Sequence, residues 1–308
     1  MFIHIDMVEI CVLTYNNGVG IVTDAILLKD LIYNNISEQV DFKFVGEQNL
    51  ETADVGIWIQ NYDINLLNLF KKNIFFINEE WAGINELSNL HLFDYVVCKS
   101  NYAKKLLAPY CNAICLPFIS KDYYSPSIKQ NHSTLHFAGR SIQKNTELIL
   151  KQSHQITLID PYSLHSPPNH FVHINKYQTQ EELQVILNTH NIHLCTSLYE
   201  SWGHYLYEGL STGNEIICSD IPAFTENLDP DLVQFVPTKI NLDYTYSFDK
   251  QNQNGGFPIR QSFHIEQQHL KDIIDNFKPI GKNEERRKLF KNIIDKNSDK
   301  LVEFFKNL

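Results

Sequence analysis

Cys195–Asn227, CTSLYESWGHYLYEGLSTGNEIICSDIPAFTEN, is the most informative stretch of this 308-residue chain. The apolar run Ile192–Thr196 that leads into it is typical of a buried strand. Gly203–Thr212 is predicted to be a helix, and Glu215–Ser219 is strand-like again. Strand, helix and strand in this order are typical of a βαβ unit, in which helices cover both faces of a parallel sheet. We therefore expect an α/β fold in this part of the chain.

The same alternation extends outward to both ends of the chain and falls into two series. A second series of strands begins at Thr134–Ala138 and Ile156–Ile159, and a helix is predicted to start at Thr179, with Glu182 completing a capping box. We predict an α/β protein with two Rossmann-like doubly wound domains that face a cleft, which one continuous sheet would contradict. The first series of predicted strands is Glu9–Thr14, Asp41–Val45, Val55–Ile59, Asn73–Ile77, Tyr95–Cys98 and Ala113–Phe118.

The polar, proline-containing stretch Ser120–Ser133 separates the two series and contains the best linker candidate. We predict an N-terminal domain at residues 1–122, a linker at 123–132 and a C-terminal domain at 133–280. Residues 281–308 have apolar side chains at helical spacing. We expect them to form a helix that packs back on the N-terminal domain.

The composition limits the classes of partner. The chain has 26 Lys and Arg against 36 Asp and Glu, a net charge of −10, which argues against nucleic acid and gives no support to membrane contact. The six cysteines are scattered and do not form a pattern typical of zinc sites. No apolar run approaches the roughly 18 residues of a membrane span, and no secretory leader is recognised. We expect a cytoplasmic protein with no bound metal.

Two carboxylates frame the predicted turn at Gly203. Glu200 follows the strand, and Glu208 lies eight positions later in the helix. Amides at a helix N-terminus favour a diphosphate, so the backbone from Trp202 to Tyr205 is a candidate phosphate site. Glu208 would then accept hydrogen bonds from ribose hydroxyls, and Glu200 from a sugar beyond the phosphates. The alternative is that both are ordinary loop and surface carboxylates.

This pattern resembles the signature of glycosyltransferase family 4, a family of retaining enzymes with the GT-B architecture. The resemblance rests on Glu200-x7-Glu208, on Ser211-Thr212-Gly213 and on the loop from Asp220 to Glu226. It also covers the segment from Phe137 to Asn145, FAGRSIQKN. This segment is similar to an element of the family in which a strand is followed by Gly-Arg, then by a Lys, and then by a helix. The resemblance implies that Arg140 and Lys144 neutralise the donor diphosphate. A surface ion pair is the alternative for Arg140.

Three loops are candidates on weaker grounds. The turn that contains Gly18 and Gly20 resembles the family's first glycine-rich loop, although either glycine alone fits a tight turn equally well. Asn78 and Glu79 follow a predicted strand where the family often has a histidine, and we expect them on the acceptor side. A helix N-cap is the alternative for Asn78. In the family, the loop equivalent to the one that contains Tyr177 holds the nucleotide base. The alternative is that Tyr177 only packs against neighbouring side chains.

His204 beside Gly203 either points toward the phosphates or caps the turn. Asp229-Pro230-Asp231 has the form of a metal-binding Asp-x-Asp motif, but the proline indicates a turn.

The combined prediction is a glycosyltransferase that moves a sugar from a UDP- or GDP-linked donor to a hydroxyl acceptor. The resemblance implies that the nucleotide sugar binds to the C-terminal domain (133–280) and that the N-terminal domain (1–122) is the acceptor side. The acceptor is a glycan, a lipid-linked or a protein hydroxyl, and the sequence does not identify which. We expect retention of configuration, and neither metal nor cofactor. Glu200, Arg140 and Lys144 are predicted to be catalytic. Two alternatives stay open, namely a nucleotide-sugar epimerase of the same fold and a non-catalytic partner of a glycosyltransferase that binds glycan or protein. The residues predicted to bind the donor are Glu208, Gly203, His204, Tyr205, Trp202, Gly18, Gly20 and Tyr177.

Overall fold

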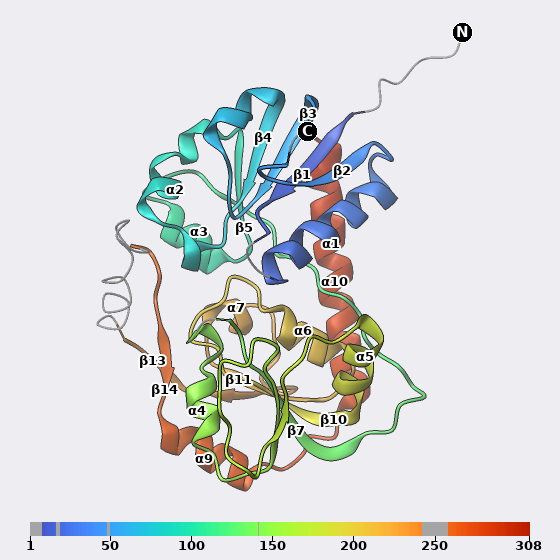
Figure 1. The fold of residues 1–308 in the computed structure, drawn as a ribbon, viewed down its shortest axis with the longest axis vertical. Coiled ribbons are helices and arrows are strands. Elements are labelled where there is room, and N and C mark those ends of the chain that lie inside the picture. Colours follow the sequence, from blue (N-terminus) through green and yellow to red (C-terminus); the bar gives the residue numbers. More distant parts are fainter. Residues whose placement is uncertain (1–7, 17–18, 48–49, 141, 242–257) are drawn as a thin grey trace. The chain divides into compact units, whose positions relative to one another are not determined.

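The computed structural model describes residues 8–16, 19–47, 50–140, 142–241 and 258–308 (Figure 1). Their contacts divide the chain into two compact units. The first unit contains the described residues within 1–119, 248–260 and 295–308. The second contains those within 120–247 and 261–294.

The first unit is built on a parallel six-stranded sheet in the order β2-β1-β3-β4-β5-β6. Helix α1 (Val19–Asn35) lies against β1 and β2 (Figure 1). The core is apolar, and the indole of its central Trp58 donates a hydrogen bond to Asn73 Oδ1 at 2.9 Å. The strands are β1 (Ile10–Thr14), β2 (Val40–Phe44), β3 (Ala53–Ile59), β4 (Phe70–Phe76), β5 (Tyr95–Cys98) and β6 (Ile114–Cys115). The remaining helical segments are η1 (Ile64–Leu69), η2 (Glu79–Trp81), α2 (Ile84–Ser88), η3 (Leu90–Leu92) and α3 (Asn101–Leu107).

The second unit repeats this plan with the strand order β12-β11-β10-β7-β8-β9, again all parallel. The predicted capping box at Thr179 and Glu182 is present at the start of α5. The strands are β7 (Asn131–Phe137), β8 (Ile156–Ile159), β9 (Val172–Ile174), β10 (His190–Cys195), β11 (Glu215–Ser219) and β12 (Gln234–Val236). The helices are η4 (Ile142–Lys144), α4 (Thr146–Leu150), α5 (Gln180–Thr189), α6 (His204–Ser211), α7 (Pro222–Thr225) and α9 (Gln267–Asn276).

A two-stranded antiparallel sheet of β13 (Thr238–Ile240) and β14 (Phe263–Ile265) was not predicted. Its strands have only three residues each and lie on either side of the Asn- and Gln-rich segment, so no hairpin turn signals their pairing. The Asn-, Gln- and Gly-rich composition of Asp249–Phe257 predicts a long surface loop, and this stretch lies outside the described residues.

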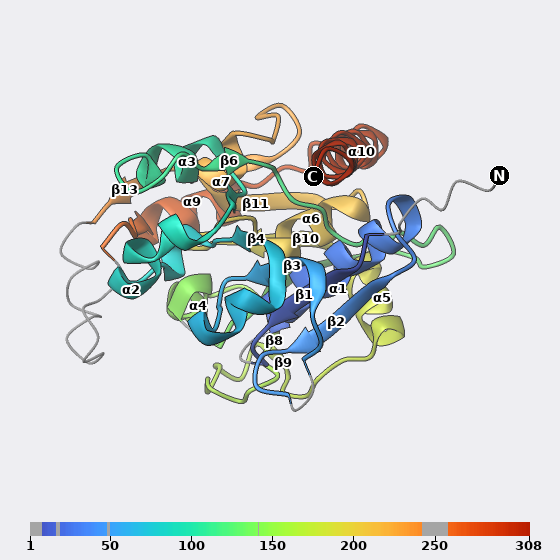
Figure 2. The same cartoon turned by 90° about the horizontal axis from the view of Figure 1, so that it is seen from above.

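The long helix α10 (Asn283–Lys306), which is seen nearly end-on in Figure 2, contributes its two halves to different units. In the first unit, Phe305 stacks on Phe76 with ring centroids 6.4 Å apart, and Asn297 donates to the Phe118 carbonyl at 2.8 Å. In the second unit, Arg286 is fully buried and donates to Glu215 Oε1 at 2.9 Å. The helix is therefore held by apolar packing at one end and by a buried ion pair at the other.

The two six-stranded parallel sheets confirm the predicted α/β class. In each sheet the strand order reverses once, between β1 and β3 in the first and between β7 and β10 in the second. In open parallel sheets, ligands bind outside the carboxyl ends of the strands at such a reversal. These two places therefore locate the candidate sites.

Candidate active site

The carboxyl ends of β7 and β10 bring together the two motifs of the second unit. The segment from Gly139 to Lys144 leaves β7, and the segment from Thr196 to Gly203 leaves β10. The two strands pair directly, with Leu194 opposite His136. Parallel pairing thus places two segments about 60 positions apart in the sequence side by side.

Glu200 is the best-connected side chain at this place. Its Oε1 pairs with Lys144 Nζ and accepts a hydrogen bond from Ser197 Oγ at 2.8 Å. Its Oε2 accepts from Gln143 Nε2 at 3.0 Å. The Glu200 side chain is 7% exposed and that of Lys144 22%. A carboxylate so buried needs these partners, because an unpaired charge would be costly there.

Backbone contacts lock the same two segments together. The Leu198 amide donates to the Gln143 carbonyl at 2.8 Å, and Gln143 Nε2 also donates to the Tyr199 carbonyl at 3.0 Å. Thr196 Oγ1 donates to the Lys144 carbonyl at 3.3 Å. Neither Gln143 nor Ser197 was among the predicted site residues. The only signal was the position of Gln143 one residue before Lys144.

Gly203 has a conformation and a position that only glycine fits. Its φ is +90°, and a Cβ there would lie 2.6 Å from the Phe224 ring and 3.6 Å from Glu200 Cγ. As the N-cap of α6 it supplies no side chain to the helix amides. The N-terminus of α6, with its partial positive charge, therefore lies beside the Glu200 side chain.

Glu208 lies in the second turn of α6 and is half-buried. Burial raises the pKa of its carboxyl, while the positive charges of His204, Lys144 and Lys121 oppose that rise. Lys144 thus acts electrostatically on both predicted carboxylates. The structure groups Glu200, Glu208 and Lys144 at one end of the sheet.

His204, Trp202 and Tyr205 are fixed by other contacts. Trp202 Nε1 donates to Ser120 Oγ at 2.9 Å, and the same oxygen lies 2.9 Å from His204 Nδ1. Trp202 also stacks on Tyr207 with centroids 4.0 Å apart. The buried Tyr205 hydroxyl donates to the Leu135 carbonyl at 2.9 Å. Trp202 and Tyr205 are core side chains, so only their backbone is left to meet a ligand.

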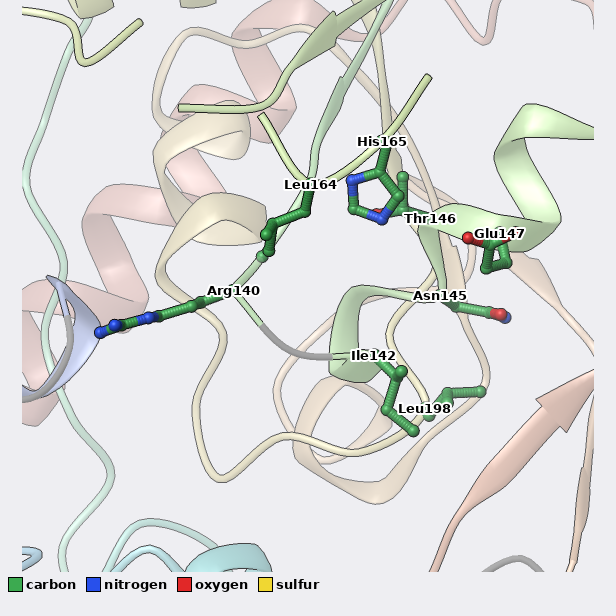
Figure 3. Close-up of a pocket in the computed structure, with 9 residues that line it drawn as sticks. Arg140, Ile142, Asn145, Thr146, Glu147, Leu164, His165 and Leu198 are labelled. Carbon is green, nitrogen blue, oxygen red and sulfur yellow. The ribbon is translucent and has the colours of Figure 1, made fainter. Parts of the chain in front are cut away.

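Arg140 is exposed, and among the described residues no hydrogen bond or ion pair joins it to the Glu200 network. Its side chain extends away from the other residues labelled in Figure 3. It lies over the ring of Tyr162 at 5.4 Å. Tyr162 in turn meets Tyr177 edge to face at 5.4 Å, and Tyr177 is 60% exposed. The structure therefore gathers Arg140 and Tyr177 around Tyr162, which sequence analysis had not singled out.

A pocket of about 190 Å³ opens beside Arg140, between β7, α4 and the loop after β8. His165 lies at its edge, with Nδ1 3.2 Å from Asp160 Oδ2 (Figure 3). Burial by itself would raise the pKa of Asp160, but hydrogen bonds from the amides of His165 and Leu164 lower it below its usual value. Asp160 is therefore an anion, and it holds His165 at the edge of the pocket. No sequence motif marks either residue.

The candidates of the first unit have different surroundings. Gly18 lies outside the described residues, and Gly20 is in the first turn of α1, where a Cβ would meet nothing within 4 Å. Asn78 is the N-cap of η2, but its side chain makes no cap hydrogen bond. The Asn78 amide donates to Gln60 Oε1 at 2.6 Å, and Glu79 beside it is buried. Asn78 and Glu79 therefore both lie at the start of η2.

Two further observations concern metals and membranes. Within the described ranges, no three His, Cys, Asp or Glu side chains form a group able to hold a metal ion. Asp229 Oδ1 accepts from the Asp231 amide at 2.9 Å, which is the geometry of a turn. None of the helices in the described part of the chain combines the length and the apolar composition that a membrane span requires.

No protein-family model matches the chain, and no curated protein does. Solved structures do. HepE of Anabaena, in complex with UDP-glucose, has a TM-score of 0.66 at 9% identity over 97% of this chain and 100% of that one. Sucrose-phosphate synthase of Thermosynechococcus elongatus has a TM-score of 0.66 at 11% identity, over 97% of this chain and 98% of its own. A glycosyltransferase of Rickettsia africae has a TM-score of 0.64 at 10% identity, over 97% of this chain and 98% of its own. These likenesses show that the chain has the GT-B fold of glycosyltransferases.

Proposed function

We propose that the protein transfers a sugar from a UDP-linked donor to a hydroxyl acceptor, with retention of configuration and without a metal. The observation that carries the proposal is the buried Glu200 carboxylate, held by Lys144, Gln143 and Ser197 beside the N-terminus of α6. A carboxylate able to accept from sugar hydroxyls and a cation able to meet a diphosphate thus lie within one hydrogen-bonded group. The fold is that of proteins solved with UDP-glucose or with UDP and N-acetylglucosamine.

The reaction breaks the bond between the anomeric carbon and the leaving diphosphate oxygen. Negative charge then grows on the diphosphate, and in this proposal Lys144, Arg140 and the amides at the start of α6 offset it. The acceptor oxygen forms the new bond to the same carbon. Its proton passes to the leaving phosphate, so the products are the glycosylated acceptor and UDP.

Lys144 has two roles in this proposal. Without donor it neutralises Glu200, whose buried charge would otherwise be unpaired. A diphosphate carries more negative charge than one carboxylate and competes for the ammonium group. Glu200 keeps its bonds to Gln143 and Ser197, and Oε1, released from Lys144, accepts from the sugar hydroxyls. The donor thereby completes the site that it enters.

The direct test is UDP release from UDP-glucose, UDP-galactose and UDP-N-acetylglucosamine by the wild type and by Lys144→Met and Glu200→Gln. We expect each variant to lose about 100-fold in rate, the magnitude typical of removing one electrostatic group from such a site. Lys151→Met is the matched control, because Lys151 is an exposed lysine at the end of α4 in the same unit. The anomeric configuration of the product is read by NMR. Wild-type rates in both variants would refute the assignment.

The same assay separates the alternatives. Interconversion of UDP-sugars without UDP release would favour an epimerase. If neither UDP nor GDP raises the melting temperature, the non-catalytic alternative is favoured, since a ligand of the folded state stabilises it by mass action.

A further inference from the structure

Two cysteines lie opposite each other on β5 and β6, the last two strands of the first unit's sheet. The parallel register pairs Cys98 with Cys115. Neighbouring strands are about 4.8 Å apart, which is within the roughly 4.4–6.8 Å that separates the Cα atoms of a disulfide. The backbone therefore already brings these two cysteines into disulfide range.

The two thiols meet in the reduced protein. The Cys98 thiol is hydrogen-bonded to the Cys115 thiol, and this bond, together with burial, raises the pKa of Cys98. Cys98 Sγ also lies 3.5 Å from the Ser100 carbonyl oxygen and 3.6 Å from the Ile114 carbonyl oxygen. All six cysteines are free thiols. Cys98 is thus a protonated thiol whose sulfur faces β6.

The two cysteines differ in their access to solvent. Cys98 is 0% exposed, whereas Cys115 is half-buried. A small oxidant therefore reaches Cys115 first, with Cys98 behind it as the resolving thiol. Strand β6 has only two residues and is the edge strand, paired among the described strands with β5 alone. It can therefore shift toward β5 and bring the Cβ atoms to the shorter spacing of a disulfide.

The second unit has a similar pair of cysteines without access to solvent. The parallel register of β10 and β11 places Cys195 opposite Cys218. These residues are 3% and 0% exposed, and burial raises the pKa of both thiols. A thiol that is buried and protonated is a poor nucleophile. The second pair therefore has the strand geometry of the first and lacks its access to an oxidant.

We propose that Cys98 and Cys115 form an oxidation site, at which hydrogen peroxide produces a disulfide between β5 and β6. The Cys115 thiolate attacks one peroxide oxygen, the O–O bond breaks, and the departing hydroxide takes up the proton that Cys115 has lost. The Cys98 sulfur then attacks the sulfur of the Cys115 sulfenic acid. The S–O bond breaks, and the second hydroxide leaves as water with the Cys98 proton. Peroxide gains two electrons, and the two thiols lose them.

The disulfide closes a loop that contains α3. Helix α3 contacts both β5 and β6 (Figure 2). The same loop contains Lys99, whose Nζ forms a buried ion pair with Asp24 of α1 and lies 4.5 Å from the centre of the Phe118 ring. A covalent link between the strands restricts the unfolded chain in this loop, so the oxidised protein resists unfolding more strongly. This proposal does not depend on the proposed function.

The test is oxidation of the folded full chain with hydrogen peroxide, alkylation of the remaining thiols in urea, and mass spectrometry of unreduced tryptic peptides. We expect two of the six thiols to be lost, recovery of both with dithiothreitol, and a cross-link between peptides 73–99 and 106–121. Peptide 106–121 also contains Cys111, so the mapping is repeated with Cys111→Ser. The cross-link should persist in that variant and be absent from Cys115→Ser.

Urea unfolding measures the consequence for stability. Oxidation should raise the wild-type midpoint by about 1 M and leave that of Cys115→Ser unchanged. The wild-type cross-link can be mapped even if the serine variant does not fold. Cys195 and Cys218 are the internal control and should keep their thiols.

Six intact thiols, oxidation of Cys115 to a sulfinic acid without a cross-link, or a cross-link through Cys111 would overturn the proposal. Loss of the Cys195 thiol as fast as that of Cys115 would overturn the role of solvent access. An unchanged or lower midpoint of the cross-linked wild type would overturn the predicted stabilisation.

Discussion

Lys144 Nζ pairs with Glu200 Oε1 across the carboxyl ends of two neighbouring strands, β7 and β10. The two residues are far apart in the sequence and come from the two separate motifs that suggested a sugar-nucleotide site. The pair joins these motifs in one network together with Gln143 and Ser197. Its removal therefore affects stability and function in separable ways.

Lys144→Met should destabilise the protein, because it leaves the Glu200 carboxylate without its cation. The double variant Lys144→Met/Glu200→Gln should recover part of this loss, since the amide carries no charge to compensate. Urea unfolding measures the free energies, and UDP release measures activity. Recovery of stability without recovery of activity is expected. Additive losses of stability would show that the pair does not couple.

Arg140→Ala should leave stability within about 0.5 kcal/mol, since Arg140 is exposed and contacts Tyr162 only through its ring face. If Arg140 meets the donor diphosphate, UDP affinity should fall roughly tenfold, the equivalent of one charge-assisted hydrogen bond. Calorimetric titration with UDP checks this. Unchanged affinity would favour the simpler role of a surface cation.

Gly203→Ala should be strongly destabilising. A side chain at a φ of +90° costs about 1–2 kcal/mol, and overlap with the Phe224 ring adds about 1–3 kcal/mol. Gly20→Ala is the matched control, because Gly20 is helical and a Cβ there meets nothing within 4 Å. Removing a helical glycine should stabilise by roughly 0.5–1 kcal/mol. Equal effects in thermal denaturation would contradict the geometry at Gly203.

Two buried histidines should make stability fall as the solution is acidified. Burial lowers the pKa of both His136 and His193 from 6.5 to about 4, with Lys144 adding to the effect at His136 and His190 at His193. The unfolded chain binds protons first, so stability is complete above pH 6.5 and declines below it. Each histidine contributes about 1.4 kcal/mol per pH unit.

Urea unfolding between pH 6.5 and 5 measures this slope. His136→Gln should reduce the slope by about 1.4 kcal/mol per pH unit, while the exposed control His269→Gln should leave the slope unchanged. A wild-type slope in the His136 variant would show that His136 is protonated in the folded protein.

The buried ion pair of Arg286 and Glu215 anchors the start of α10. Arg286 also donates to the Gly213 and Leu232 carbonyls at 3.0 and 3.3 Å. Arg286→Met should cost about 3–5 kcal/mol, because Glu215 is then left buried without its cation. The exposed pair of Lys271 and Asp275 gives the control, since Lys271→Met should leave the urea midpoint unchanged. A midpoint within error of wild type for Arg286→Met would contradict this role.

The sequence by itself determined the α/β class, the two series of strands and the elements that carry Glu200, Glu208, Arg140 and Lys144. These follow from local periodicity and from glycine and capping positions, which act within a few residues. It also placed the turn at Gly203, because few residues other than glycine reach that backbone conformation.

Only the tertiary structure decided which side chains meet. Trp202 and Tyr205 have their rings in the core, whereas Gln143 and Ser197 hold Glu200, because contacts between strands depend on pairing that no local pattern encodes. A pocket lined by Tyr15 and Asn61, among others, lies at the ends of β1 and β3, and these strands neighbour each other only because the strand order reverses there. A sequence specifies such an order through the packing of the whole sheet.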